Sequence, residues 1–202
     1  MMKRYYITVS IEDAERAIRT HPMTFDHKRG FEVLCACVLA KTLPEPDGEF
    51  PQLVLPTRDG YRPGDLPADV SLWEILDSSK VSDDDSDFGL KIGGEARMFQ
   101  ATRLICGSRD DHPFETLKEL IKKKMRGPRD DSLSLVILSN ETFDYPLVGM
   151  EEWFSKQAVP FGNVVMITQE GISQNHGEFR CLTLFPEFLE SITVRLHIYG
   201  HL

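Results

Sequence analysis

Apolar residues recur at helical spacing over residues 28–43, which is the strongest helix signal in the chain. The positions between them are mostly apolar too, and Val33–Ala40 is the longest uninterrupted apolar run. A helix that is apolar on nearly all sides is typically buried. A second helix is predicted to start after an N-cap at Ser10, with Asp13 three residues later, and to run to about Thr20.

Strands are predicted where apolar and polar residues alternate or where apolar residues form short runs. Residues 97–105 alternate, and residues 132–139 form a run typical of a strand buried on both faces. A helix with one apolar stripe is expected between them, over residues 114–126, and Gly127-Pro128 closes it. The other predicted elements are strands over Tyr6–Val9, Ala68–Ile75, Gly89–Ile92, Asn163–Thr168, Phe179–Phe185 and Ser191–Tyr199, an edge segment over Pro51–Pro56 and a short helix over Gly149–Ala158.

This order of helices and strands predicts an α/β fold with a mixed central sheet flanked by helices. The chain has 202 residues, of which 41% are apolar and 27% charged, so one domain with an ordinary core is expected over residues 1–202. The longest apolar run is far shorter than the roughly 20 residues that a transmembrane helix needs. No apolar signal core follows the basic pair Lys3-Arg4.

The formal net charge of −9 opposes binding to nucleic acids and to anionic membranes, so DNA binding would require a local basic patch. Acidic residues cluster in the run 83–87. A cluster of cations on the predicted helix 114–126 is suited to phosphate contacts, and an ordinary solvated helix end is the alternative. Its members are Lys118, Lys122, Lys123, Lys124 and Arg126.

The four cysteines show no spacing typical of a zinc site or a redox motif. They are Cys35, Cys37, Cys106 and Cys181. We therefore expect reduced, mostly buried thiols and a cytoplasmic protein.

Three polar residues are candidates for metal-dependent chemistry. Glu32 lies inside the apolar helix, and a buried carboxylate costs several kcal/mol unless a cation, a metal or hydrogen bonds compensate it. Asp69 and Gln100 lie in two predicted strands, and their oxygens could hold Mg²⁺ that activates water if the strands are adjacent. The structural alternatives are an ion pair from Glu32 to Lys28 or Arg29, an edge position for Asp69 and a satisfied core amide for Gln100.

The predicted elements follow in this order: a helix with Glu, strands bearing Asp and then the Glu/Gln-x-Lys position, a helix and an apolar strand. This order resembles the PD-(D/E)xK, or restriction-endonuclease-like, superfamily. Glu32 in Gly-Phe-Glu-Val-Leu matches the acid of the first helix, and Asp69 in Pro-Ala-Asp-Val matches the metal-binding aspartate. Gln100 in Met-Phe-Gln-Ala-Thr-Arg matches the Glu/Gln position. Over residues 28–170 the resemblance implies a restriction-endonuclease-like core with N-terminal helical and C-terminal β extensions. It also implies a metal-dependent phosphodiesterase that uses Mg²⁺, held by Asp69 and Gln100, on double-stranded DNA.

Thr102 stands at the lysine position of this pattern and cannot stabilise developing negative charge as an ammonium does. Arg103 is the nearest cation, but strand alternation points it to the opposite face unless a bulge intervenes. Asp65 could replace Asp69 as the acid. The implied catalytic set is therefore Glu32, Asp69, Gln100 and Thr102 or Arg103, in either an active enzyme or a catalytically degenerate relative.

Two further functions stay open. One is a non-catalytic interaction protein on the same scaffold that forms a homodimer through exposed apolar residues. The other is an unrelated α/β fold with a pocket for a small ligand. A P-loop nucleotide site is not predicted, because the Gly-x-x-x-x-Gly-Lys-Ser/Thr motif is missing.

Overall fold

The computed structural model describes residues 5–20, 28–43, 50–57, 87–105, 113–126, 130–139, 149–173, 176–187 and 189–197. The predicted strand Ala68–Ile75, which contains Asp69, lies outside these residues, and so do Asp65 and Cys106. Within them the strands are β1 (Tyr5–Ser10), β2 (Gln52–Thr57), β3 (Phe88–Ile92), β4 (Glu95–Leu104), β5 (Asp130–Ser139), β6 (Phe161–Ser173), β7 (His176–Phe185) and β8 (Leu189–His197). The helices are α1 (Ile11–Thr20), α2 (Lys28–Ala40), α4 (Pro113–Lys124) and α5 (Met150–Ser155).

The eight strands form one mixed sheet whose spatial order follows the chain, from β1 to β8. Strands β1 to β4 pair antiparallel, β4, β5 and β6 pair parallel, and β6 to β8 pair antiparallel again. Helices occur in both parallel connections, α4 between β4 and β5 and α5 between β5 and β6. The α/β class with a mixed sheet is thereby confirmed, with a sheet far larger than the helical part.

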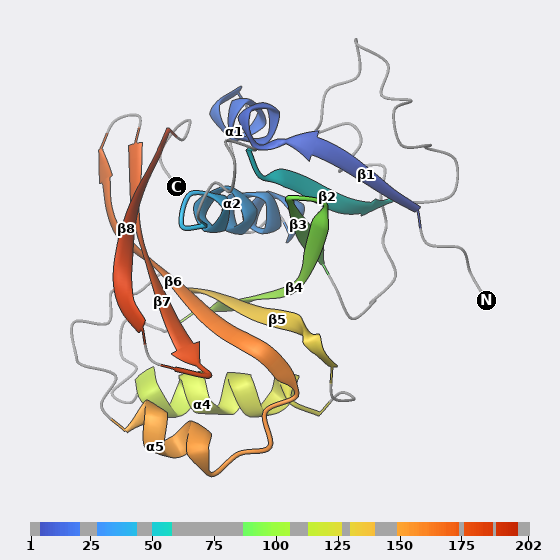
Figure 1. Ribbon diagram of the computed structural model, residues 1–202. Helices are drawn as coiled ribbons and strands as arrows, with labels where there is room; N and C mark the ends of the chain where they lie inside the picture. Colours follow the sequence, from blue (N-terminus) through green and yellow to red (C-terminus); the bar gives the residue numbers. More distant parts are fainter. Residues whose placement is uncertain are drawn as a thin grey trace.

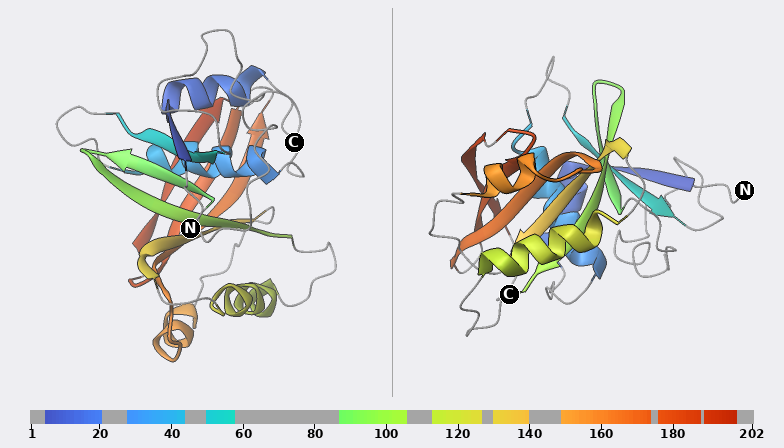
Figure 2. Two further views of the ribbon diagram at one scale, coloured as in Figure 1. Left: turned by 90° about the vertical axis from the view of Figure 1, so that its right-hand side faces the viewer. Right: turned by 90° about the horizontal axis from the view of Figure 1, so that it is seen from below.

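The sheet curves around α1 and α2, while α4 and α5 cover its other face (Figures 1 and 2). Alternation along the strands separates two apolar clusters accordingly. In β4, Phe99 and Ala101 belong to the cluster that contains α1 and α2, whereas Leu104 and Met98 belong to the cluster that contains α4 and α5. Strand β5 contributes to both clusters, as predicted from its continuous apolar run.

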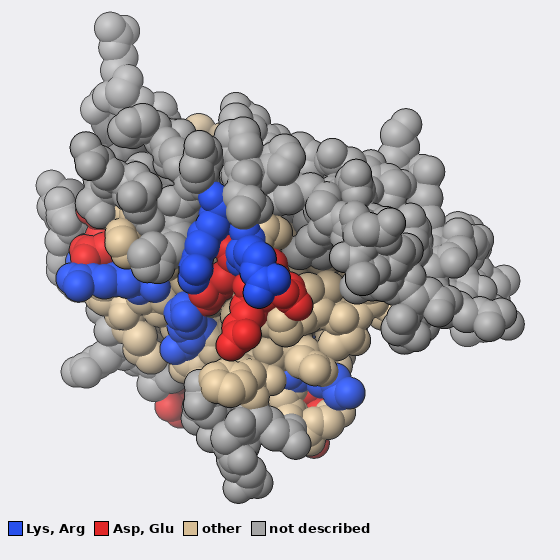
Figure 3. All heavy atoms as spheres, turned by 90° about the horizontal axis from the view of Figure 1, so that it is seen from above, with Lys and Arg blue, Asp and Glu red and all other residues tan. Residues whose placement is uncertain are grey.

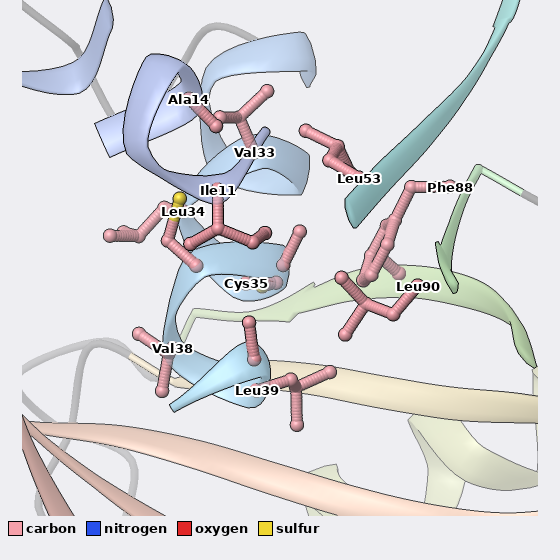
Figure 4. Packing of buried hydrophobic residues seen from close by; sticks show 14 of the residues in the cluster. Ile11, Ala14, Val33, Leu34, Cys35, Val38, Leu39, Leu53, Phe88 and Leu90 are labelled. Carbon is pink, nitrogen blue, oxygen red and sulfur yellow. The ribbon is translucent and has the colours of Figure 1, made fainter. Parts of the chain in front are cut away.

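Helix α2 is the centre of the first cluster. Every residue from Phe31 to Ala40 is buried, with at most 5% of its surface exposed. Figure 4 shows Val33 of α2 directed toward Leu53 of β2, with Phe88 and Leu90 of β3 on the same side of the helix. The predicted all-round burial is confirmed, although the helix ends at Ala40 and continues only as a turn to residue 43.

Helix α1 follows β1 without a connecting loop. The backbone N–H of Asp13 donates to Ser10 Oγ at 3.1 Å, and that hydroxyl donates to Asp13 Oδ2 at 2.7 Å. These two bonds confirm the predicted N-cap, which satisfies one of the free N–H groups of the first turn. Among the described helices, none is long and apolar enough to cross a membrane.

The segment Pro51–Pro56 was expected at an edge of the sheet, and this prediction is wrong. Strand β2 pairs with β1 on one side and with β3 on the other. The sheet tolerates Pro56 because β3 pairs only with Gln52 to Val54, so no β3 residue lies opposite the missing N–H. The N-terminal extension consists of the predicted strand over Tyr6–Val9, which is β1, and of the predicted helix, which is α1.

Two glycines of β6 provide a matched test of this packing. A Cβ atom added to Gly162 would lie far inside contact distance of the Asp131 carbonyl oxygen, whereas one added to Gly171 meets nothing within 4 Å. Gly162→Ala should therefore lower the free energy of unfolding by about 1–3 kcal/mol, measured by urea denaturation. Gly171→Ala is the control and should change it by less than about 1 kcal/mol. Equal effects of the two variants would contradict the described pairing of β5 and β6.

Candidate functional site

The structure places Gln100 and Glu32 on opposite sides of the sheet. Glu32 lies on α2 and is completely buried on the concave side. Gln100 and Thr102 alternate with Phe99 and Ala101 along β4, so they share the face that α4 covers. The predicted convergence of Glu32 with Gln100 and Thr102 in one pocket is therefore absent from this structure.

Arg103 lies on the same side of the sheet as Glu32. Its guanidinium carbon is 5.2 Å from the centroid of the Phe31 ring, which belongs to α2. Alternation along β4 predicted that Arg103 faces away from Gln100, and this contact agrees with it. A cation over an aromatic face contributes about 0.5–2 kcal/mol, so the contact helps to hold α2 against β4.

Asp87 lies immediately before β3 and is a carboxylate that the sequence reasoning missed as a site residue. Its N–H donates to the Phe99 carbonyl at 2.8 Å, and its Oδ2 accepts the N–H of Ala101 at 2.7 Å. A hydrogen bond to a charged carboxylate is worth about 1.5–3 kcal/mol, so Asp87 fastens the start of β3 to β4. The available signal was its place two residues before the predicted strand Gly89–Ile92, and the neighbouring acids of the run 83–87 obscured it.

Glu32 and Asp87 share an electrostatic neighbour in Cys35. Burial raises the pKa of the Cys35 thiol well above its usual value, and Cys181, Glu32, Cys37 and Asp87 raise it further. Both carboxylates thus lie within electrostatic reach of one thiol on α2. Within the described residues, Glu32 and Asp87 are the two carboxylates that raise the pKa of this thiol.

The described residues do not complete the predicted magnesium site, because its aspartate, Asp69, lies outside them. A hard divalent cation takes about six oxygen ligands, usually including several carboxylates. One oxygen of Asp87 is engaged by Ala101, Glu32 is enclosed, and Gln100 faces the other side of the sheet. No group of three or more His, Cys, Asp or Glu suited to a metal exists in the described part of the chain. The assignments of Asp69 and Asp65 stay predictions, because both residues lie outside it.

Three cysteines, Cys35, Cys37 and Cys181, are free and buried, as predicted. Burial raises the pKa of Cys181 to about 12 and also raises that of Cys37, whose thiol lies near Glu15. A thiol with a raised pKa stays protonated at neutral pH and is a poor nucleophile. These cysteines therefore act as small apolar core residues.

The C-terminal end of α4 carries positive charge that no described acid neutralises. Lys118 pairs with Glu115 at 2.8 Å, and the Lys122 ammonium lies 6.0 Å from the centroid of the Trp153 ring. Lys122, Lys123 and Arg126 are exposed and Lys124 is half-buried. Within the described ranges, none of these last four cations forms an ion pair. This end of α4 is defined here as the basic end, comprising Lys122, Lys123, Lys124 and Arg126.

The cations around α1 differ because acids accompany them. Arg19 and Lys41 both contact the Glu15 carboxylate, at 3.3 and 2.7 Å, and Arg16 pairs with Asp13 at 3.1 Å. Figure 3 shows basic and acidic side chains interleaved on this face of the molecule. A cavity of about 590 Å³ opens here, between α1, the end of α2 and Pro51. Because its charges largely cancel, this face is poorly suited to binding phosphates.

Comparison with known proteins does not extend this picture. No protein-family model, curated protein or solved structure matches the chain. A functional assignment therefore has to be argued from the placement of residues described above.

The raised thiol pKa values lead to a prediction of low reactivity. At pH 8, Cys35, Cys37 and Cys181 should react with iodoacetamide far more slowly in the native protein than in urea, because burial keeps each thiol protonated and inaccessible. Mass spectrometry of the labelled peptides measures this. Ile105→Cys, at a position 65% exposed, is the control and should react rapidly without urea. Rapid native labelling of Cys35 would contradict the enclosure of α2.

Proposed function

We propose that the chain is a catalytically degenerate relative of the PD-(D/E)xK nucleases that binds double-stranded DNA without cleaving it. The order and direction of the elements from α2 to β5 support the kinship. A helix with a buried acid is followed by three antiparallel strands, a helix and an apolar strand that runs parallel to β4. This is the succession that the superfamily pattern requires, with β1, α1, β7 and β8 as additions.

The proposed loss of cleavage is supported by the chemistry around β4. Thr102 occupies the position where the pattern has lysine, and it lies on the opposite side of the sheet from Glu32. Arg103 shares the side of Glu32, but its guanidinium is over the Phe31 ring. Neither residue thereby supplies a cation on the side of Gln100 that could stabilise the charge of a phosphorane-like transition state.

The proposed DNA contact is the basic end of α4, and its uncompensated charge is the single observation that carries the proposal. Three of its cations lie in the last turn of α4 and the fourth, Arg126, lies in the turn that follows the helix. None of the four forms an ion pair in the described structure. Cations that contact phosphates release condensed counterions from DNA, so such a patch gives affinity even in a chain with a net charge of −9. The dipole of α4 also favours cations at this end, which makes the cluster compatible with a stable helix.

DNA binding through α4 is tested with the double variant Lys123→Gln/Arg126→Gln. Fluorescence anisotropy of a labelled duplex, measured over a range of salt concentrations, should show weaker binding. The slope of log K against log salt should become less steep by about 1.8, because each lost phosphate contact removes about 0.9. Arg16→Gln/Arg19→Gln is the matched control, and it should leave the slope unchanged. An equal loss in both variants, or no saturable binding by the wild type, would refute the α4 interface.

Absence of cleavage is tested with supercoiled plasmid in Mg²⁺ or Mn²⁺. The wild type should nick no more plasmid than the Asp87→Asn variant, because the described residues bring together too few oxygen ligands to hold either metal. Asparagine keeps a side-chain oxygen that can accept the Ala101 N–H, so this variant removes charge with little expected cost to folding. Nicking by the wild type that is lost in Asp87→Asn would show an active enzyme and refute the degeneracy.

The homodimer also stays a prediction. The large exposed apolar residues of the described chain are Phe50, Ile105 and Ile192, which precede β2, follow β4 and lie on β8, respectively. Single exposed apolar residues on separate segments are ordinary for a soluble domain and define no interface. The structure thus offers no specific observation that favours dimerisation over DNA binding.

A further inference from the structure

A second cavity, of about 270 Å³, lies on the concave side of the sheet at the C-terminal end of α2. Its lining comes from Leu39 at the end of α2, from the turn after α2 and from strands β4 to β8, so it has both a helical and a sheet wall. It is separate from the basic end of α4, which belongs to the other side of the sheet. Any ligand of this cavity would therefore be bound independently of the proposed DNA contact.

Two polar residues, Ser134 and Asn163, lie beside Phe99 in the sheet wall of this cavity. Phe99 of β4, Ser134 of β5 and Asn163 of β6 lie side by side in the register of the two parallel ladders. Asn163 Nδ2 donates to Ser134 Oγ at 3.4 Å. Ser134 is only 6% exposed, and the next residues of β5 on the same face, Val136 and Leu138, are apolar core. The buried Ser134 hydroxyl interrupts an otherwise apolar face, and the exposed Asn163 amide beside it adds a second directed hydrogen-bonding group.

Arg97 provides the single charge of the described lining. It lies two residues before Phe99 on the same face of β4 and is exposed. No ion pair of Arg97 occurs within the described structure. A guanidinium presents paired N–H donors that match the two oxygens of a carboxylate. The cavity thus has an electropositive, hydrogen-bonding rim.

The remaining lining is mostly apolar. Leu43 from the turn after α2, Val165 of β6 and Ile192 of β8 each contribute a side chain to the cavity. Ile192 is 49% exposed although the neighbouring residues on its face of β8, Val194 and Leu196, are core. A small apolar group bound beside it would remove this surface from water.

We propose that this cavity binds a small amphipathic carboxylate. The carboxylate contacts Arg97 at the rim, and Ser134 and Asn163 orient it. Its short apolar body packs against Leu43, Val165 and Ile192. The volume is just below the range of roughly 300–1,000 Å³ typical of drug-sized ligands, which favours a short-chain acid over a nucleotide or a lipid.

The test compares hexanoate with probes of matched shape, using isothermal titration calorimetry on the full chain. Hexanoate should bind saturably, whereas 1-hexanol, hexylamine and inorganic phosphate should each bind at least about tenfold more weakly, because a charge-assisted hydrogen bond is worth about one such factor or more. Weak binding of all four probes would refute the site. Equal binding of hexanol would show an apolar cavity without a carboxylate contact, and equal binding of phosphate would show a site for simple anions; either result would overturn the proposal.

Four variants test whether hexanoate binds in this cavity and not elsewhere on the molecule. Arg97→Gln should lower the affinity for hexanoate about tenfold or more and leave the affinity for hexanol unchanged. Arg195→Gln is the matched control, since Arg195 lies on β8 between Val194 and Leu196 and so faces the other side of the sheet. Ser134→Ala should also weaken hexanoate, and a native circular dichroism spectrum shows that the variant is folded. Lys123→Gln/Arg126→Gln should bind hexanoate as the wild type does. An unchanged affinity in Arg97→Gln would overturn the assignment.

Discussion

The enclosure of α2 is the constraint on which the rest of the structure depends. A helix with apolar side chains on every side cannot rest on one flat surface, because one of its faces would stay in water. The sheet meets this requirement by curving, so that β2 and β3 cover one side of α2 and β7 and β8 approach another, while α1 covers it further. The long sheet follows from this requirement, since a short one could not reach around the helix. Even the thiols of α2 are part of the packed interior.

The local elements were largely predictable from the sequence because their signals are local. The apolar periodicity of α2, the Ser10 cap of α1 and the continuous apolar run of β5 each depend on a few neighbouring residues. The order of the strands in the sheet was harder to predict from the sequence. Nothing within Pro51–Pro56 indicates that β1 pairs along it, and that pairing converts a presumed edge into an interior strand.

The candidate site shows the same limit more sharply. Alternation along β4 correctly separated Arg103 from Gln100, but it could not indicate which of the two faces α2. That choice depends on how helices far away in the sequence cover the sheet. It leaves Glu32 on the side of α2 and Gln100 on the side of α4. The pattern of residue types alone therefore predicted a convergence of side chains that the arrangement of the helices prevents. The cavity at the end of α2 was equally hidden, because its lining comes from strands β4 to β8 as well as α2.

The burial of α2 by β8 has a consequence for synthesis on the ribosome. The helix emerges early, whereas the strand that supplies Val194 and Leu196 to its surroundings emerges last. Translation at about 5–20 residues per second leaves an interval of the order of ten seconds in which an apolar helix exists without its full cover. During that time the apolar residues of this segment are open to contacts with other chains, which is the condition under which incompletely folded proteins aggregate.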